Sequence, residues 1–537
     1  MGNRRTESNL TVKAKAARTA LIGLVLLVVG CGSPKINSIA PGSGYPRQLL
    51  AVKGNTVFAK VVWDVGLPTE IELYNGLFGT SYFQVPVGST PGPHPVALRS
   101  SEGTSNTVNV TVLAPSGVFP APRIEDVGLM GVSGTGPIDA AIVITGANLD
   151  VNATVSINGS TPQATVRWGA LPVDFLLTHT PATFGYPIYH YVQLLAIANN
   201  LALGSTVTIV VTNTDGLSAT TTYKLPATLA EQDSDGDGLR DAWENGSYTA
   251  PSGGTVDLAG MGTNPRRKDI LVEVDWIAAA TPNANIWATI EAAFANAPVL
   301  NPNGSRGVNI VIDRGQGGAF TGGGTVLADH TFMDFGPNTA AGYTDFFTYK
   351  ANSFNNDRLN VFHYAIFGRA RPNGTSGVGE IVGNDFMITF RNFNAWAQAL
   401  AQAGTFIHEL GHNLGLTHGD LLNTPGQNSE TYKPNFASTM SYRWQFSGVS
   451  IDCNWVSEGI HTYSPGYYAR ITESNVNENV GICDNAPLDM NGDGQFSGSV
   501  AIDFKNDGTT TAVHDDFDQW GNLFLNFRAP VSGWNNN

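Results

Sequence analysis

The chain has 537 residues and a formal net charge of −15, with 14% charged residues and 61 glycines. This length exceeds what one hydrophobic core supports and predicts three to five domains. The negative charge argues against nucleic acid as a partner. Few charges and many glycines are typical of β-rich extracellular modules with many turns.

The first 30 residues predict an export signal. A cationic stretch precedes Ala20–Gly30, an apolar run too short to span a bilayer. The run ends in Val28-Val29-Gly30-Cys31, which resembles the bacterial lipoprotein signal. The resemblance implies cleavage before Cys31 and a lipid anchor on that cysteine. Because Gly32 follows, it also implies sorting to the outer membrane or the cell surface of the bacterial envelope. A plain secretory peptide with a chance cysteine is the alternative.

Residues 31–115 and 116–227 each predict an all-β module. Short β-branched runs alternate with turns rich in Gly, Pro and Ser, as expected of β-sandwiches. Residues 34–44 and 142–149 resemble the starts of the immunoglobulin-like modules of plexins and transcription factors, and residues 210–218 resemble an end. The resemblance implies two immunoglobulin-like sandwiches and says little about their ligands.

Residues 228–254 contain a sequence that fits a twelve-residue calcium loop at every position. Gly238 supplies the sharp turn, Leu239 offers its carbonyl, Asp241 binds directly or through water, and Glu244 is placed to bind with both oxygens. The remaining carboxylates come from Asp233, Asp235 and Asp237. The loop resembles the calcium loops of EF-hands and, without long flanking helices, those of thrombospondin-type linkers. We expect structural Ca²⁺ to stiffen this hinge; a solvated acidic linker is the alternative.

From 255 to 485 the pattern becomes a mixture of helices and strands. Apolar runs predict strands, and three- and four-residue spacing predicts helices. Strands are expected at 270–276, 308–313, 361–367 and 383–390, with helices at 286–296 and 394–414.

The second of these helices carries the most informative motif, His408-Glu-Leu-Gly-His412-Asn-Leu-Gly415-Leu-Thr-His418. Histidines four residues apart lie on one face of a helix, where both can bind one Zn²⁺. Gly415 can end the helix in the left-handed conformation, so that the chain reverses and His418 becomes the third ligand. Glu409 lies beside the metal, where a general base belongs. A chance occurrence of the shorter five-residue pattern is common, but the extended form is not.

The segment Ser438-Thr-Met440-Ser-Tyr442 follows downstream. The extended motif with a later methionine turn resembles the metzincin clan of zinc endopeptidases. The resemblance implies that Met440 forms a base under the imidazoles and that Tyr442 contacts the zinc or the tetrahedral intermediate. It also implies an α+β catalytic domain with a mixed twisted sheet, in which a strand such as 383–390 lies at the edge and pairs with an extended substrate.

The expected activity is hydrolysis of a protein or peptide substrate by a zinc-activated water, with Glu409 as general base. Two alternatives remain open. One is a calcium-dependent surface adhesin with an inactive protease fold, against which the intact Glu409 argues. The other is a zinc aminopeptidase.

Two further cysteines, Cys453 and Cys483, most simply form one disulfide in an oxidising compartment; two unpaired thiols are the alternative. The C-terminal segment, 486–537, begins like another calcium loop, with Asp489, Asn491 and Asp493 as candidate ligands. Its twelfth position is Val500 instead of glutamate. The sequence therefore predicts a multidomain protein of two sandwiches, a hinge, a metzincin-like peptidase domain and a calcium-rich tail.

Overall fold

The computed structural model describes residues 33–526, except for the gaps 41, 57–58, 67–69, 72, 76–80, 115–120, 134–136, 151–152, 163, 173–189, 337, 390–398, 420–432, 451–453, 467, 469 and 483–486. The chain divides into two compact units, Met1–Leu113 and Ala114–Asn537. No helix among the described residues is long and apolar enough to cross a membrane.

The first unit is a pair of β-sheets that share a core. One sheet has the order β1-β3-β7-β6, and the other has the order β2-β10-β8-β4-β5 with β9 beside β8. Alternating side chains of both sheets, among them Val52, Trp63, Phe83 and Val110, are buried between them. The strands are Lys35–Ala40 (β1), Ser43–Gly44 (β2), Leu49–Asn55 (β3), Lys60–Trp63 (β4), Glu70–Ile71 (β5), Tyr74–Asn75 (β6), Ser81–Gln84 (β7), Gly92–Ser100 (β8), Gly103–Thr104 (β9) and Val108–Val112 (β10).

The second unit begins with another two-sheet module. Its larger sheet has the order β11-β12-β15-β14, and the smaller has the order β13-β16-β17. Every pair of neighbouring strands in both sheets is antiparallel. The strands are Arg123–Ser133 (β11), Ile138–Ala147 (β12), Thr154–Ile157 (β13), Ala164–Pro172 (β14), His190–Leu201 (β15), Thr206–Thr212 (β16) and Ser218–Lys224 (β17).

The acidic loop follows and ends in a single helical turn, α2 (Asp241–Glu244). A two-stranded ribbon of β18 (Tyr248–Thr249) and β19 (Thr255–Val256) leads into the main sheet, whose order is β21-β20-β25-β27-β26, with β22 beside β20. All pairs in this sheet are parallel except β26 with β27. The strands are Asp269–Ile277 (β20), Asn309–Asp313 (β21), Val326–Leu327 (β22), His363–Gly368 (β25), Gly377–Gly379 (β26) and Asp385–Thr389 (β27).

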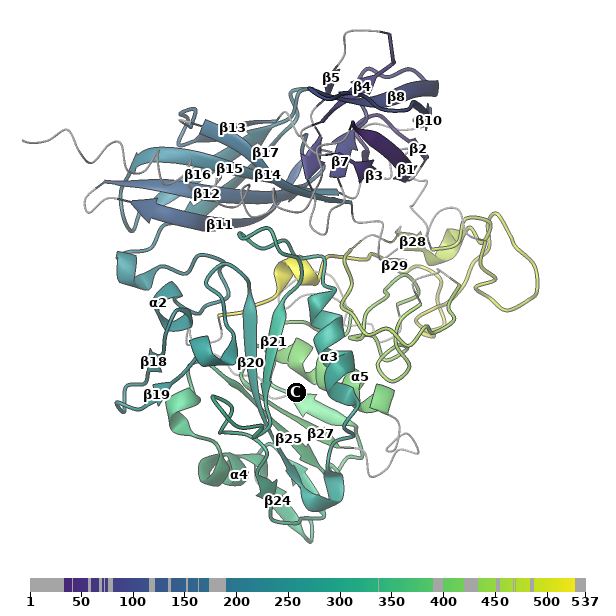
Figure 1. The fold of residues 1–537 in the computed structure, drawn as a ribbon. Helices are drawn as coiled ribbons and strands as arrows, with labels where there is room; N and C mark the ends of the chain where they lie inside the picture. The colour runs from purple at the N-terminus through teal and green to yellow at the C-terminus, as the bar shows by residue number, and fades with distance from the viewer. Residues whose placement is uncertain are drawn as a thin grey trace, which may run out of the picture. The chain divides into compact units, whose positions relative to one another are not determined.

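Two helices pack against each other beside this sheet (Figure 1). They are α3 (Ile286–Ala295) and α5 (Ala399–Asn413). Trp287 of α3 meets Phe406 of α5 edge to face, with 6.4 Å between ring centroids. The remaining elements of this part are short: β23 (Phe332–Asp334), β24 (Tyr343–Asp345), α4 (Phe346–Ser353), β28 (Ile471–Thr472) and β29 (Val513–His514).

The coarse prediction is confirmed, because the chain is a multidomain, β-rich protein, and the helices among its described residues all lie after 228. The apolar runs at 270–276, 308–313, 361–367 and 383–390 all form strands, and 286–296 forms a helix. The expected start of the active-site helix near Asn394 lies outside the described residues. One detail is wrong. The strand from 383–390 lies inside the sheet, and the three-residue β26 takes the edge.

Candidate functional site

The helix α5 and the turn after it bring the three motif histidines together. His408 and His412 lie one turn apart, with 4.9 Å between their ring centroids. The helix ends because Gly415 adopts a φ of +85°. There the amides of Gly415 and Leu416 bind the carbonyls of His412 and Gly411 at 2.9 Å each. The reversal brings His418 within 4.9 Å of the His412 ring. The candidate ligand nitrogens of all three imidazoles lie within 4.8 Å of one another.

Backbone carbonyls fix the tautomers of two of these rings. Nδ1 of His408 lies 2.9 Å from the carbonyl oxygen of Thr439, and Nδ1 of His412 lies 2.8 Å from that of Leu416. Because a carbonyl oxygen only accepts, each Nδ1 carries the hydrogen and each Nε2 keeps its lone pair.

Burial also keeps the three imidazoles neutral. It lowers the pKa of His412 to about 4 and that of His418 to about 3, with His412 adding to the second shift. The pKa of His408 lies well below its usual value because of burial, with His412 and His418 contributing. Three neutral imidazoles with converging lone pairs are a donor set that fits Zn²⁺.

Glu409 lies in the same cleft, pressed against β26. A Cβ built on Gly377 would lie 2.6 Å from the Glu409 carboxylate, and one on Gly379 would lie 2.4 Å from its backbone oxygen. Burial raises the pKa of Glu409 to about 8, and the nearby Arg371 opposes this shift. The close contact requires glycine at both positions and places the carboxylate at the edge strand.

Arg371 holds that edge strand in place. Its guanidinium pairs with the Asp334 carboxylate at 2.9 Å and donates a hydrogen bond to the Gly377 carbonyl at 2.9 Å. The arginine therefore connects the backbone of β26 to the segment that carries β23. No sequence pattern pointed to Arg371.

Met440 of the segment 438–442 packs against α5. Met440 is fully buried, and a Cβ on Gly411 would lie 2.4 Å from its sulfur. Tyr442 is 41% exposed, with its ring 4.4 Å from that of His418. Tyr463, which the sequence did not single out, is fully buried and donates a hydrogen bond to the Ile407 carbonyl at 2.7 Å. A single tyrosine without a motif carries no signal that would have identified it.

These groups line an open cleft of about 460 Å³. The three histidines, Glu409 and Tyr442 line it together with the whole of β26. The other lining residues are Arg371, Asn373, Thr375, Ser376, Ile381, Gln445 and Phe446.

The acidic loop gathers most, but not all, of its expected ligands. The carboxylates of Asp233, Asp235 and Asp237 form one group within 4.8 Å, and those of Asp237, Glu244 and Asp269 form another. Asp269 begins β20 and was missed, because a calcium-loop pattern covers twelve contiguous residues and Asp269 lies beyond them. Burial, with Asp235 and other carboxylates adding to it, raises the pKa of Glu244 to about 10.

Asp241 and Leu239 were also expected to bind the ion. The structure turns the Asp241 carboxylate elsewhere: it accepts from the amide and hydroxyl of Ser234 at 2.8 Å each and from Gln232 at 2.7 Å. The side chain of Asp241 therefore stabilises the loop through hydrogen bonds to Gln232 and Ser234. Leu239 is buried, and its amide donates to Asp237 at 2.7 Å.

The candidate loop near the C-terminus brings together Asp489, Asn491 and Asp493, with the Asn491 amide donating to Asp493 at 3.0 Å. Asn491 and Asp493 are exposed. Among the described residues, this loop contributes to no group of three metal-binding carboxylates or histidines. The remaining expected site residues, Cys31, Cys453 and Cys483, lie outside the described residues.

No protein-family model and no curated protein matches the chain. Among solved structures, the SGBP-B protein of the Bacteroides ovatus mixed-linkage glucan utilization locus, in complex with a mixed-linkage heptasaccharide, is 14% identical with a TM-score of 0.15. It matches 36% of this chain and 46% of its own. The γ-CGTase of alkalophilic Bacillus clarkii is 13% identical with a TM-score of 0.14, over 36% of this chain and 26% of its own.

The extracellular region of plexin A4 is 12% identical with a TM-score of 0.16, over 37% of this chain and 18% of its own. This chain spans less than half the length of each of these structures. At such TM-scores the likenesses identify neither the fold nor the function of this chain.

Proposed function

We propose that the protein is a zinc-dependent endopeptidase that cleaves an extended protein or peptide segment bound in the cleft along β26. The observation that carries the proposal is the convergence of three neutral imidazoles in a cleft that Glu409 also lines. His408, His412 and His418 would hold the zinc. The metal would supply a Lewis acid that polarises the scissile carbonyl and makes a water molecule more acidic.

The residues around the three histidines have separate roles in this proposal. The Glu409 carboxylate would take a proton from the attacking water on one oxygen and donate it to the leaving amine. The Tyr442 hydroxyl, whose ring lies 4.4 Å from that of His418, would donate a hydrogen bond to the developing oxyanion. Met440 would keep the imidazoles in place from below, because it is fully buried against Gly411.

The edge strand supports an endopeptidase in particular. β26 ends the sheet order, so it has only one partner strand within the sheet, and its residues line the cleft. An extended segment can hydrogen-bond to such an edge through its main chain, whatever its sequence. Gly377 and Gly379 have no side chains, which leaves room for Glu409 against this strand.

The decisive experiment compares wild type with Glu409→Gln on a proteome-derived peptide mixture, with new termini mapped by mass spectrometry. We expect cuts inside peptides by wild type and a rate about 10²–10⁴-fold lower for Glu409→Gln. Zinc content, measured by mass spectrometry of the metal, should be equal in both.

Glu380→Gln is the matched control. Glu380 is also a buried glutamate near the cleft, but its carboxylate accepts from the amides of Asn384 and Asp385 at 3.1 and 3.2 Å. This variant should keep both zinc and activity. Absence of cuts by zinc-loaded wild type, or loss of zinc from Glu409→Gln, would contradict the proposal.

A further inference from the structure

The acidic loop at 233–244 buries three carboxylates that form no ion pair among the described residues, although the Lys268 ammonium bonds the nearby Asp235 carbonyl. Asp235 is fully buried, Asp237 is 3% exposed and Glu244 is 2% exposed. Among the described residues, no lysine or arginine forms an ion pair with any of these three. Neither oxygen of Glu244 has a hydrogen-bond partner there, and neither does Oδ2 of Asp235. Unpaired charges at this depth are strongly unfavourable, so the arrangement favours binding of a cation.

The strand β20 adds a carboxylate to this cluster from outside the loop. The carboxylate of its first residue, Asp269, lies within 4.8 Å of those of Asp237 and Glu244. It already accepts hydrogen bonds from Arg267, Asn264 and Asn309. A carboxylate has about four acceptor positions, which leaves one for a metal. The Asp269 amide also donates to Asp237 at 2.7 Å, which connects the loop directly to the strand.

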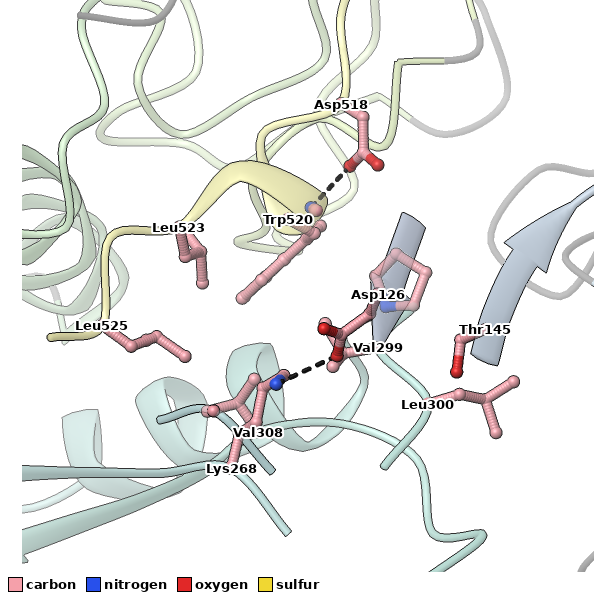
Figure 2. Close-up of a pocket in the computed structure, with 13 residues that line it drawn as sticks. Asp126, Thr145, Lys268, Val299, Leu300, Val308, Asp518, Trp520, Leu523 and Leu525 are labelled. Carbon is pink, nitrogen blue, oxygen red and sulfur yellow. Dashed lines mark hydrogen bonds and ion pairs between the residues drawn. The ribbon is translucent and has the colours of Figure 1, made fainter. Parts of the chain in front are cut away.

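The neighbouring Lys268 connects the same cluster to the preceding β-module. Its ammonium pairs with Asp126 of β11 at 3.0 Å, as Figure 2 shows, and it also donates to the backbone carbonyl of Asp235. In addition, the Leu129 amide of β11 binds the Ser234 carbonyl at 2.8 Å. Two segments distant in sequence, β11 and the start of β20, therefore meet at the acidic loop.

We propose that Asp233, Asp235, Asp237, Glu244 and Asp269 bind one Ca²⁺, and that this ion locks the module of β11–β17 onto the sheet that carries the cleft. Ca²⁺ is favoured because it accepts six to eight oxygen ligands in an adaptable geometry, whereas Mg²⁺ retains several waters. Gly236 and Gly238, with φ of +78° and +89°, let the loop curve around the ion. The ion site does not depend on the peptidase activity proposed above.

The ligand set is tested by calcium titration of the full chain after EGTA treatment, using isothermal calorimetry. Asp269→Asn should weaken the tightest site at least tenfold. Asp241→Asn should change it less than threefold, because asparagine can still accept the Ser234 amide and the Asp241 carboxylate is turned away from the cluster. Calcium binding that depends on Asp241 and not on Asp269 would overturn the proposal, as would a tightest site that survives Glu244→Gln.

The locking role is tested by hydrogen exchange with calcium and with EGTA. Calcium should slow exchange at least tenfold in both β11 and β20, and Asp269→Asn should remove both effects. Protection confined to residues 233–244 would show a local ion site and overturn the locking role. Peptide cleavage by the same samples is a separate readout, so failure of the calcium site and failure of the peptidase proposal can be distinguished.

Discussion

The loops at 233–244 and 489–500 have nearly the same local structure and very different surroundings. In each, the first aspartate accepts from the amides three and five residues later, at 2.8 and 2.8 Å for Asp233 and at 2.7 and 2.8 Å for Asp489. In each, the third ligand position accepts from the amide two residues on, at 2.7 Å for Asp237 and 2.8 Å for Asp493. The short pattern of aspartates and glycines is therefore sufficient to shape the loop.

What differs is the glutamate that each loop meets. Glu244 is buried beside Asp237 and Asp269, without a hydrogen-bond donor among the described residues. Glu478, beneath the second loop, is also buried, but it accepts from the amides of Met490, Asn491 and Ser497 at 2.8, 3.1 and 3.1 Å. The first glutamate has both oxygens available for a cation, whereas backbone amides already satisfy the second. The local pattern determines the shape of the loop, and the hydrogen bonding of the nearby buried glutamate determines whether that glutamate can bind an ion.

The largest effect is expected when the two glutamates are exchanged for uncharged residues. Glu478→Ala leaves three amides without an acceptor and should lower the free energy of unfolding by at least about 3 kcal/mol, with or without calcium. Glu244→Gln removes a ligand, and its new amide can donate to the neighbouring carboxylates of Asp237 and Asp269. It should match or exceed wild-type stability in EGTA and lose only the stabilisation that calcium adds. Urea unfolding in calcium and in EGTA measures the free energy of unfolding of both variants. If calcium stabilised the two variants equally, the two glutamates would not differ in ion binding.

In the cleft, the residue at position 379 is likewise restricted by a contact with a residue distant in sequence, Glu409. Adding a methyl group there would place Cβ 2.4 Å from the backbone oxygen of Glu409, which cannot move without shifting α5. Gly379→Ala should therefore cost about 1–3 kcal/mol of stability and lower kcat/KM. At Gly88, by contrast, a Cβ would meet no atom within 4 Å, so Gly88→Ala should be as stable as wild type or slightly more stable. Normal kcat/KM in Gly379→Ala would mean that β26 does not position the cleft.

The parts that could be predicted from the sequence are those set by contiguous residues. Apolar runs predicted β20, β21, β25 and β27, and the motif predicted that His408, His412 and His418 converge, because helical spacing and a glycine turn fix their relation locally.

The parts that could not be predicted depend on pairing across the fold. β26 has only three residues, two of them glycine, and no strand signal. Asp269 joins the acidic loop only because β20 lies beside it, and Asp241 turns away because Ser234 and Gln232 offer donors. A sequence pattern identifies candidate ligands by their spacing along the chain. Which carboxylates can reach a common ion depends on the tertiary structure.

The smallest effect is expected at Asp493, and it tests the comparison most directly. Asp493 occupies the same place in its loop as Asp237 does, but it is exposed, and asparagine could still accept the Gln495 amide. Asp493→Asn should change the free energy of unfolding by no more than about 0.5 kcal/mol in calcium or in EGTA. Asp237→Asn should abolish the calcium-dependent part of the stability, because its carboxylate belongs to both groups of the buried cluster. If Asp493→Asn also lost calcium-dependent stability, the local pattern alone would be enough to bind the ion, and the surroundings would matter less than the two glutamates indicate.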